Sequence, residues 1–302
     1  PSSLGDALPF IVGFAVAVIL FEGGMNLRLS RIRREGKTIR QLITTGALVT
    51  ALGGTVTAKV FLGWDWRISL LFGVIVIVTG PTVITPLLRR LKLRRSVSTV
   101  LEAEGVLLDA IGAVIAVVAL EIALSPSGLS FLTGLFHIIT RLIVGSAIGA
   151  AGGFLLAFLL RFRNLVPEGL ENVFTLSLVF ALFQGANSMS PESGIVAVTV
   201  AGLVVGNMKT HVQRELREFE EQMTVLLIGM LFILLAADVR LIEVTELGWG
   251  GIITVVILVC ILRPLNVYIG TMGSNLNIRQ KALLSWIAPR GIVAAAVASL
   301  FA

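Results

Sequence analysis

Long apolar stretches recur along the whole chain and are separated by short polar segments. Each stretch has about 20 residues, the length that an α-helix needs to cross roughly 30 Å of hydrocarbon. Because a helix satisfies its backbone hydrogen bonds internally, we predict an all-α polytopic membrane protein. About ten spans are expected, at residues 8–27, 41–63, 68–88, 97–124, 131–160, 171–187, 193–207, 222–241, 249–269 and 282–302.

Composition agrees with this pattern. Hydrophobic residues make up 56% of the 302 residues and charged residues 14%, against about 25% charged in an ordinary soluble domain. The mean hydropathy is +0.97. Cys260 is the single cysteine, which excludes an internal disulfide. The chain begins at Pro1 and stops directly after a hydrophobic segment, so we expect a fragment that lacks one or more terminal helices.

The net charge of +6 is explained by topology rather than by nucleic-acid binding. One alternating set of connections between the predicted spans holds most of the lysines and arginines: residues 28–40, 89–95, 161–170, 208–221 and 270–281. The opposite set carries only Arg67. The positive-inside rule therefore places the basic set in the cytoplasm and the N-terminus outside. We expect a multi-pass protein of the inner (plasma) membrane, surrounded by the lipid bilayer and without a nucleic-acid partner.

Asp109, in the segment LEAEGVLLDAIGAV, lies inside the fourth predicted span. It is about twelve residues from the cytoplasmic start, or about 18 Å at about 1.5 Å per residue. A short carboxylate cannot reach water from that depth. It must bind a cation, take up a proton or pair with a base, and the first two options together describe a transport cycle.

Two further charged residues lie too deep to be dismissed. Glu104 precedes Asp109 by five residues and faces another side of the same helix, about 140° away. Arg263, in the segment CILRPLNVY, lies deep in the ninth predicted span and needs an acidic partner. Glu104 is a plausible partner, in which case the pair would hold two helices together.

Two predicted spans contain interruptions at mid-membrane depth, where proline and glycine weaken the helical hydrogen bonds. The residues are Thr79, Gly80 and Pro81 in the third span, and Pro289, Arg290 and Gly291 in the tenth. Paired broken helices are typical of secondary transporters with inverted repeats, whose freed carbonyl groups meet an ion at the midplane. Two ordinary proline kinks are the alternative. Glu22, in ILFEGGMNL, is either an ion ligand or the capping acid of a kinked helix.

Six motifs, in this order along the chain, resemble the monovalent cation/proton antiporters: ILFEGGMNL, TGPTV, EGVLLDAIGA, SGIVAVTVAGLVVGN, CILRPLNVY and APRGIV. The similarity is greatest to the bacterial NhaP-type sodium/proton antiporters, which are related to animal sodium/hydrogen exchangers. The resemblance implies an NhaA-like fold with inverted repeats and two crossed discontinuous helices. It implies one transmembrane transporter domain over 1–302, with a core around 68–124 and 249–302, dimerisation helices in the remainder, and a homodimer.

The same resemblance assigns roles to individual residues. Asp109 would bind the monovalent cation or the proton, Thr79 would be the broken-helix threonine, and Glu22 would be an ion ligand. Glu104 and Arg263 would form a structural ion pair. The chain departs from the family where Leu108 replaces the usual asparagine, and where Gly80 and Gly105 replace an aspartate and a serine. These departures remove oxygen atoms that water or backbone carbonyls would have to replace.

The expected function is electroneutral exchange of one Na+ or K+ for one proton by alternating access, in the service of pH homeostasis. Asp109 would carry either ion but never both, and Li+ is a further candidate substrate. The alternative is a cation channel or channel-like K+ efflux pathway, gated by a cytosolic regulatory domain outside this chain. An enzyme is not expected, because the sequence has neither a paired catalytic aspartate motif nor an HExxH metal site. No cofactor is expected.

Overall fold

The computed structural model describes residues 7–80, 84, 87–88, 93–124, 131–162, 170–208, 213–238, 245–287 and 291. Within these residues every regular element is a helix, and no strand is present. The helices form two compact units. Unit 1 comprises Pro1–Leu29 and Leu135–Ala236, and unit 2 comprises Ser30–Gly134 and Ala237–Ala302.

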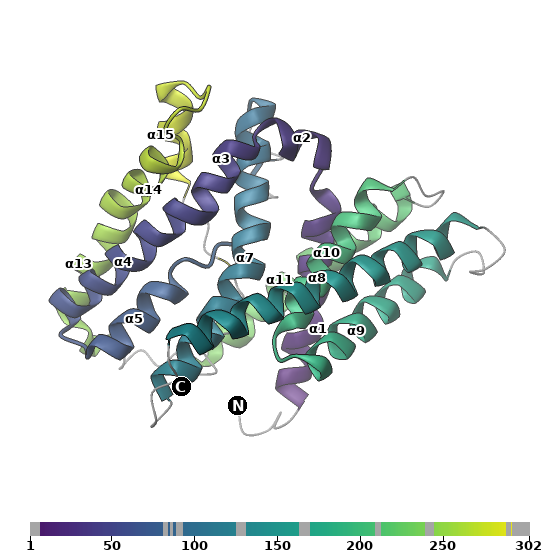
Figure 1. Cartoon of the computed structure of the whole chain (residues 1–302), viewed down its shortest axis with the longest axis horizontal. Helices are drawn as coiled ribbons and strands as arrows, with labels where there is room; N and C mark the ends of the chain where they lie inside the picture. Colours follow the sequence, from purple (N-terminus) through teal and green to yellow (C-terminus); the bar gives the residue numbers. More distant parts are fainter. Residues whose placement is uncertain are drawn as a thin grey trace. The chain divides into compact units, whose positions relative to one another are not determined.

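Unit 1 is built around the short helix α10. Its helices are α1 (Ala7–Asn26), most of α8 (Phe131–Arg161), α9 (Glu171–Met189), α10 (Ser193–Asn207) and α11 (Gln213–Asp238). α10 contacts both α1 and α9, and Figure 1 shows α8 and α9 running side by side. Every position of α10 from Ser193 to Thr199 is buried. A helix that is covered on all sides needs mainly apolar residues on every face, as α10 has.

Small residues let the helices of unit 1 approach closely. A methyl group placed on Gly149 of α8 would lie 2.8 Å from the Cα of Ala197 in α10. On the other side of α10, a methyl group on Gly202 would lie 2.9 Å from the carbonyl carbon of Phe21 in α1. Contacts this short leave no room for a side chain. The spacing of glycines in GSAIGAAGG predicts such a packing face, and the structure confirms it.

Unit 2 contains two long helices that each include π-helical turns. The first runs through α3 (Gly36–Gln41), η1 (Leu42–Gly46), α4 (Ala47–Thr57) and η2 (Ala58–Leu62), and the second through α13 (Gly248–Ile257), η3 (Leu258–Leu262) and α14 (Arg263–Gly270). The remaining helices are α2 (Leu29–Arg34), which begins at the end of unit 1, α5 (Trp66–Ile75), α7 (Arg95–Leu124) and α15 (Ile278–Trp286). α14 packs against η1 and α4, and α5 packs against both α4 and α7, as Figure 1 shows.

Caps define where two of these helices begin. The Asp65 side chain accepts a hydrogen bond of 3.1 Å from the backbone N–H of Arg67 and so starts α5. α15 starts with a capping box in which Asn277 and Gln280 satisfy each other's backbone N–H groups. Both helices therefore have ends that the local sequence specifies.

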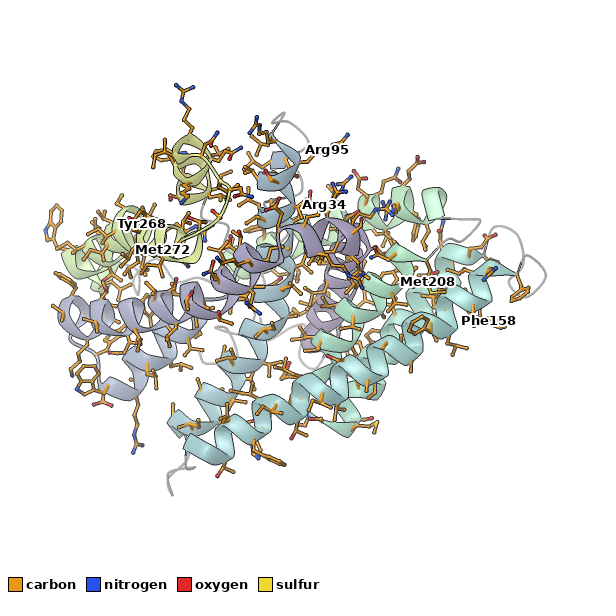
Figure 2. All side chains as sticks on the ribbon, turned by 45° about the horizontal axis from the view of Figure 1, so that its top comes forward. Arg34, Arg95, Phe158, Met208, Tyr268 and Met272 are labelled. Carbon is orange, nitrogen blue, oxygen red and sulfur yellow. The ribbon has the colours of Figure 1, made fainter. Side chains whose placement is uncertain are left out.

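Among the described residues, four continuous helices are long and apolar enough to cross a membrane: Gly36–Leu62, Arg95–Ala123, Thr133–Arg161 and Gly248–Gly270. Shorter apolar helices lie at Phe10–Asn26, Trp66–Ile75 and Ser193–Asn207. Large apolar side chains face outward, as Phe158 and Tyr268 do in Figure 2, with 54% and 60% of their surface exposed. Exposed apolar surface of this kind suits contact with lipid.

Three predicted spans differ from the observed helices. The span predicted at 68–88 is interrupted, because α5 ends at Ile75 and Val78–Gly80 are not helical. α15 ends at Trp286, and most of the span predicted at 282–302 lies outside the described residues. α11 starts at Gln213 rather than at 222. The polar segment before residue 222 is helical, which hydropathy alone does not reveal.

We predict opposite effects for two glycine substitutions in unit 1. Gly202→Ala should destabilise the protein by about 1–3 kcal/mol, because the added methyl group overlaps the α1 backbone. Gly185→Ala, in α9, meets nothing within 4 Å and should stabilise the helix by about 0.5–1 kcal/mol. Thermal unfolding in detergent measures both. Equal melting temperatures for Gly202→Ala and wild type would contradict the described packing of α1 on α10.

Candidate ion-binding site

Asp109 lies in the middle of the thirty-residue helix α7. Its side chain is fully buried, with 0% of its surface exposed. Neither carboxylate oxygen accepts a hydrogen bond from the residues that the structure describes. A buried ionised carboxylate without partners costs several kcal/mol, so this group is stable only when it holds a proton or a cation.

Both helix interruptions in unit 2 reach Asp109. A methyl group placed on Gly291 would lie 2.8 Å from Oδ1 of Asp109, and one placed on Gly80 would lie 3.5 Å from Oδ2. The two glycines also touch each other, since the methyl group on Gly291 would lie 2.8 Å from the Cα of Gly80. Backbone from the two interruptions therefore meets at the carboxylate of Asp109. Pro81, Pro289 and Arg290, which were predicted at the same interruptions, lie outside the described residues.

Thr79 connects the first interruption to α7. Its hydroxyl group donates a hydrogen bond of 3.3 Å to the backbone carbonyl of Glu104, and the side chain is buried. Because the hydroxyl group uses its hydrogen in this bond, the lone pairs of its oxygen remain available as a cation ligand.

Glu104 and Arg263 form a bidentate ion pair between α7 and α14. Nη1 and Nη2 of Arg263 donate to the two carboxylate oxygens, the second bond measuring 3.1 Å. Nε of Arg263 donates a bond of 3.2 Å to the carbonyl of Ile287, the residue that follows α15. Arg263 thus fixes α7, α14 and the start of the second interruption together. Because both charges are paired, Glu104 does not need a transported ion.

Two of the departures noted in the sequence lie against each other. A methyl group on Gly105 would be 3.3 Å from the carbonyl oxygen of Gly80. Two backbones pack here, at the two positions where the sequence resemblance leads us to expect polar side chains. Leu108 is 2% exposed and belongs to an apolar cluster with Ala47, Ala51 and Ile77. The residue before Asp109 therefore packs toward α4 and contributes no polar atom.

Glu22 lies in unit 1, near the end of α1. It is 5% exposed and accepts a hydrogen bond from the side-chain amide of Asn26. α1 stays helical through both glycines that follow Glu22, and Gly24 packs against α10, where a methyl group would lie 3.0 Å from the backbone nitrogen of Leu203. These contacts support the interpretation of Glu22 as an acid at a helix end. Its role as an ion ligand stays a prediction.

Sequence reasoning missed two groups. The carbonyl of Ile287 accepts from Arg263, and no sequence signal marks a backbone acceptor. Glu220 is fully buried in α11, although the segment 208–221 is predicted as a cytoplasmic connection between two spans. The spacing of four residues between Leu216, Glu220 and Thr224 would have indicated a helix face.

Comparison with known proteins shows the family of this chain. The family model described as "Sodium/hydrogen exchanger, transmembrane" matches residues 1–302. The Na(+)/H(+) antiporter NhaH of Halobacillus aidingensis is 23% identical over 300 residues, which cover 95% of this chain and 73% of that protein. The K(+)/H(+) antiporter NhaP2 of Shewanella oneidensis is 28% identical over 287 residues, which cover 94% of this chain and 49% of that protein.

The fold is also found among solved structures. The sodium proton antiporter MjNhaP1 from Methanocaldococcus jannaschii at pH 8 superposes with a TM-score of 0.79 and 23% sequence identity. The match covers 96% of this chain and 73% of that one. The likeness confirms an all-helical fold of the antiporter type.

We predict that Glu104→Leu destabilises the protein by about 3–5 kcal/mol, because it leaves the guanidinium group of Arg263 buried without a counter-charge. The double variant Glu104→Leu/Arg263→Leu should recover much of that loss, since it removes both charges. Unfolding of the two single variants and the double variant gives the coupling energy. If the double variant lost as much stability as the two single variants together, the two side chains would not act as a pair.

Proposed function

Because this chain belongs to the sodium/hydrogen exchanger family, we propose that it exchanges one monovalent cation, Na+ or K+, for one proton across the membrane. The observation that carries the proposal is Asp109, which is fully buried and has no hydrogen-bond partner among the described residues. A proton or a cation removes the cost of its buried charge. Each excludes the other, because both bind the same carboxylate.

The neighbouring ion pair supports a stoichiometry of one cation to one proton. Glu104 is neutralised by Arg263, so among these buried groups Asp109 alone changes its state during transport. Asp109 together with its bound ion carries no net charge, whether that ion is a proton or a monovalent cation. Exchange of one ion for the other is therefore electroneutral.

The cation shell would draw on the groups that meet at Asp109. Its own two oxygens, the hydroxyl oxygen of Thr79 and backbone carbonyls of the two interruptions are the available ligands, and water would complete the shell. Leu108, Gly80 and Gly105 supply no side-chain oxygen. Relatives named for Na(+)/H(+) exchange and for K(+)/H(+) exchange both match this chain. Na+ and K+ are therefore the first cations to test, and Li+ is the third.

The transport site lies within unit 2, which we propose as the ion-carrying core. Unit 2 includes both segments that the sequence assigns to the core, 68–124 and 249–302, and adds the helix Gly36–Leu62. The meeting of the two interruptions at Asp109 supports crossed discontinuous helices from two inverted repeats. Alternating access would expose Asp109 first to one side of the membrane and then to the other.

The topology follows from the basic connections. Arg34 in α2 and Arg95 in the first turn of α7 lie at the same end of unit 2 (Figure 2), which supports placing both connections in the cytoplasm. The protein is a multi-pass membrane protein, and we propose the inner membrane as its site. A homodimer and a cytosolic regulatory domain are further parts of the proposal. The first rests on the family resemblance, and the second stays a prediction from the sequence.

The relatives give no support to the alternative of a cation channel, because they are named as antiporters. For the same reason the protein is a transporter and not an enzyme.

We predict that Asp109→Asn abolishes cation-driven proton flux in proteoliposomes while the protein stays folded. The amide binds neither a proton nor a cation in place of the carboxylate. Asp65→Asn is the matched control, because Asp65 is exposed and asparagine caps a helix as well as aspartate does. Flux at the wild-type rate in Asp109→Asn would refute the assignment of the transport site.

We also predict that the rate of exchange does not depend on membrane potential. Proton flux is measured in proteoliposomes with Na+, K+ and Li+ in turn, with and without an imposed potential. One cation moves for each proton, so no net charge crosses the membrane. A rate that rises with potential would mean unequal ion counts, and a conductance independent of protons would mean a channel.

A further inference from the structure

A polar pair joins α4 to α14 inside unit 2. Asn266 of α14 donates through Nδ2 to the hydroxyl oxygen of Thr50 in α4 at 2.8 Å, and both side chains are buried. The hydroxyl group of Thr50 in turn donates to the carbonyl of Gly46 at 3.1 Å. Because this hydroxyl group has one hydrogen, which Gly46 receives, Asn266 must present its NH2 group to Thr50. The two hydrogen bonds therefore run from α14 to the last residue of the π-helical turn η1.

Glycine makes this contact possible. A methyl group placed on Gly46 would overlap Oδ1 of Asn266 and would lie 3.1 Å from its Cγ. One turn further along α14, a methyl group on Gly270 would lie 3.2 Å from the Cα of Leu42, the first residue of η1. α14 therefore lies close against η1 and α4, and the amide group of Asn266 fits between their backbones.

The pair fixes a register more than it stabilises the interface. Oδ1 of Asn266 has no hydrogen-bond partner among the described residues. A buried carbonyl oxygen without a partner costs free energy, and apolar groups of the same shape in place of both partners can be nearly neutral for stability. A hydrogen bond between two buried side chains is directional, however, and specifies one arrangement of the helices that carry them.

Three contacts join α4, α7 and α14 in pairs. The polar pair is the first, the ion pair between Arg263 and Glu104 is the second, and the packing of Leu108 toward α4 is the third. Arg263 and Asn266 are three residues apart and so share one face of α14. Asp109 directly follows Leu108 in α7. The helix with the buried carboxylate is thus held by the same two helices that the polar pair connects.

Arg263 links the position of α14 to the proposed ion site. Its Nε donates to the carbonyl of Ile287 at 3.2 Å, where the second interruption begins. Gly291, four residues later, touches Asp109. A shift of α14 against α4 therefore displaces the donor that holds this interruption, and with it backbone that borders the carboxylate.

We propose that Thr50 and Asn266 are positioning residues for cation binding at Asp109. The pair sets the register of α14, and through Arg263 it sets the backbone that would surround the cation. A cation needs several oxygen ligands at suitable distances, whereas a proton needs one carboxylate oxygen. Loss of the pair should therefore weaken cation binding and leave proton binding nearly unchanged. The inference rests on the proposed exchange at Asp109.

The test is cation-driven proton flux of Thr50→Val in proteoliposomes, with Na+ and K+ titrated in turn. Valine keeps the shape of threonine and removes the hydroxyl group. KM for the cation that the wild type transports should rise about tenfold, the lower end of the effect that outer partners have on metal affinity. The kcat and, at saturating cation, the pH dependence of flux should match the wild type. Thr50→Ser keeps the hydroxyl group and should restore KM, and an unchanged KM in Thr50→Val would overturn the proposal.

Thr57→Val is the matched control. Thr57 is also buried in α4, but its hydroxyl group donates to the carbonyl of Gly53 in the same helix. A role in folding alone would lower the amount of active protein and leave KM in place. The control should therefore keep the wild-type KM. An equal rise of KM in Thr50→Val and Thr57→Val would contradict a special role of the pair.

The double variant Thr50→Val/Asn266→Leu keeps the test decisive if Thr50→Val does not fold. It leaves no buried amide without a partner, so it should fold, and its KM should stay raised because the register is no longer fixed. A wild-type KM in the double variant would refute the positioning role.

The same flux measurements separate this inference from the proposed function. If the wild type shows no cation-driven flux, or Asp109→Asn shows normal flux, both proposals are wrong. If the wild type exchanges and Asp109→Asn does not, but Thr50→Val has the wild-type KM, only the positioning role is wrong.

Discussion

The cost of holding a charge away from water governs the arrangement of unit 2. Two acids lie five residues apart on α7, and they differ in whether a basic side chain neutralises them. Glu104 receives two hydrogen bonds from Arg263 and is permanently neutralised. Asp109 has no such partner among the described residues. The first acid can therefore hold helices together, and we propose that the second binds a cation and a proton in turn.

Close backbone approach is the second requirement, and glycine provides it in both units. In unit 2, Gly80 and Gly291 bring two interrupted segments against Asp109. In unit 1, Gly149 and Gly202 let α10 lie against α8 and α1. The proposed ion site would therefore draw on backbone oxygens at positions where the resemblance expects side-chain oxygens.

Glu220 shows that proximity to arginine is not enough to pair a buried acid. The guanidinium group of Arg217 is directed at carbonyls that end α1 and α10. Helix ends and carboxylates compete for the same donors, and here the helix ends have them.

The sequence alone determined what depends on local pattern: the apolar helices, the depth of Asp109, the two interruptions and the need of Arg263 for an acid. The helices against which Glu220 and Leu108 pack could not be predicted, because residue spacing marks a helix face but does not say which helix that face meets. Only the tertiary structure decided that, and it also brought Arg263 to Glu104 across a separation of 159 residues. Contacts between distant segments depend on how whole helices pack, and no local pattern contains that information.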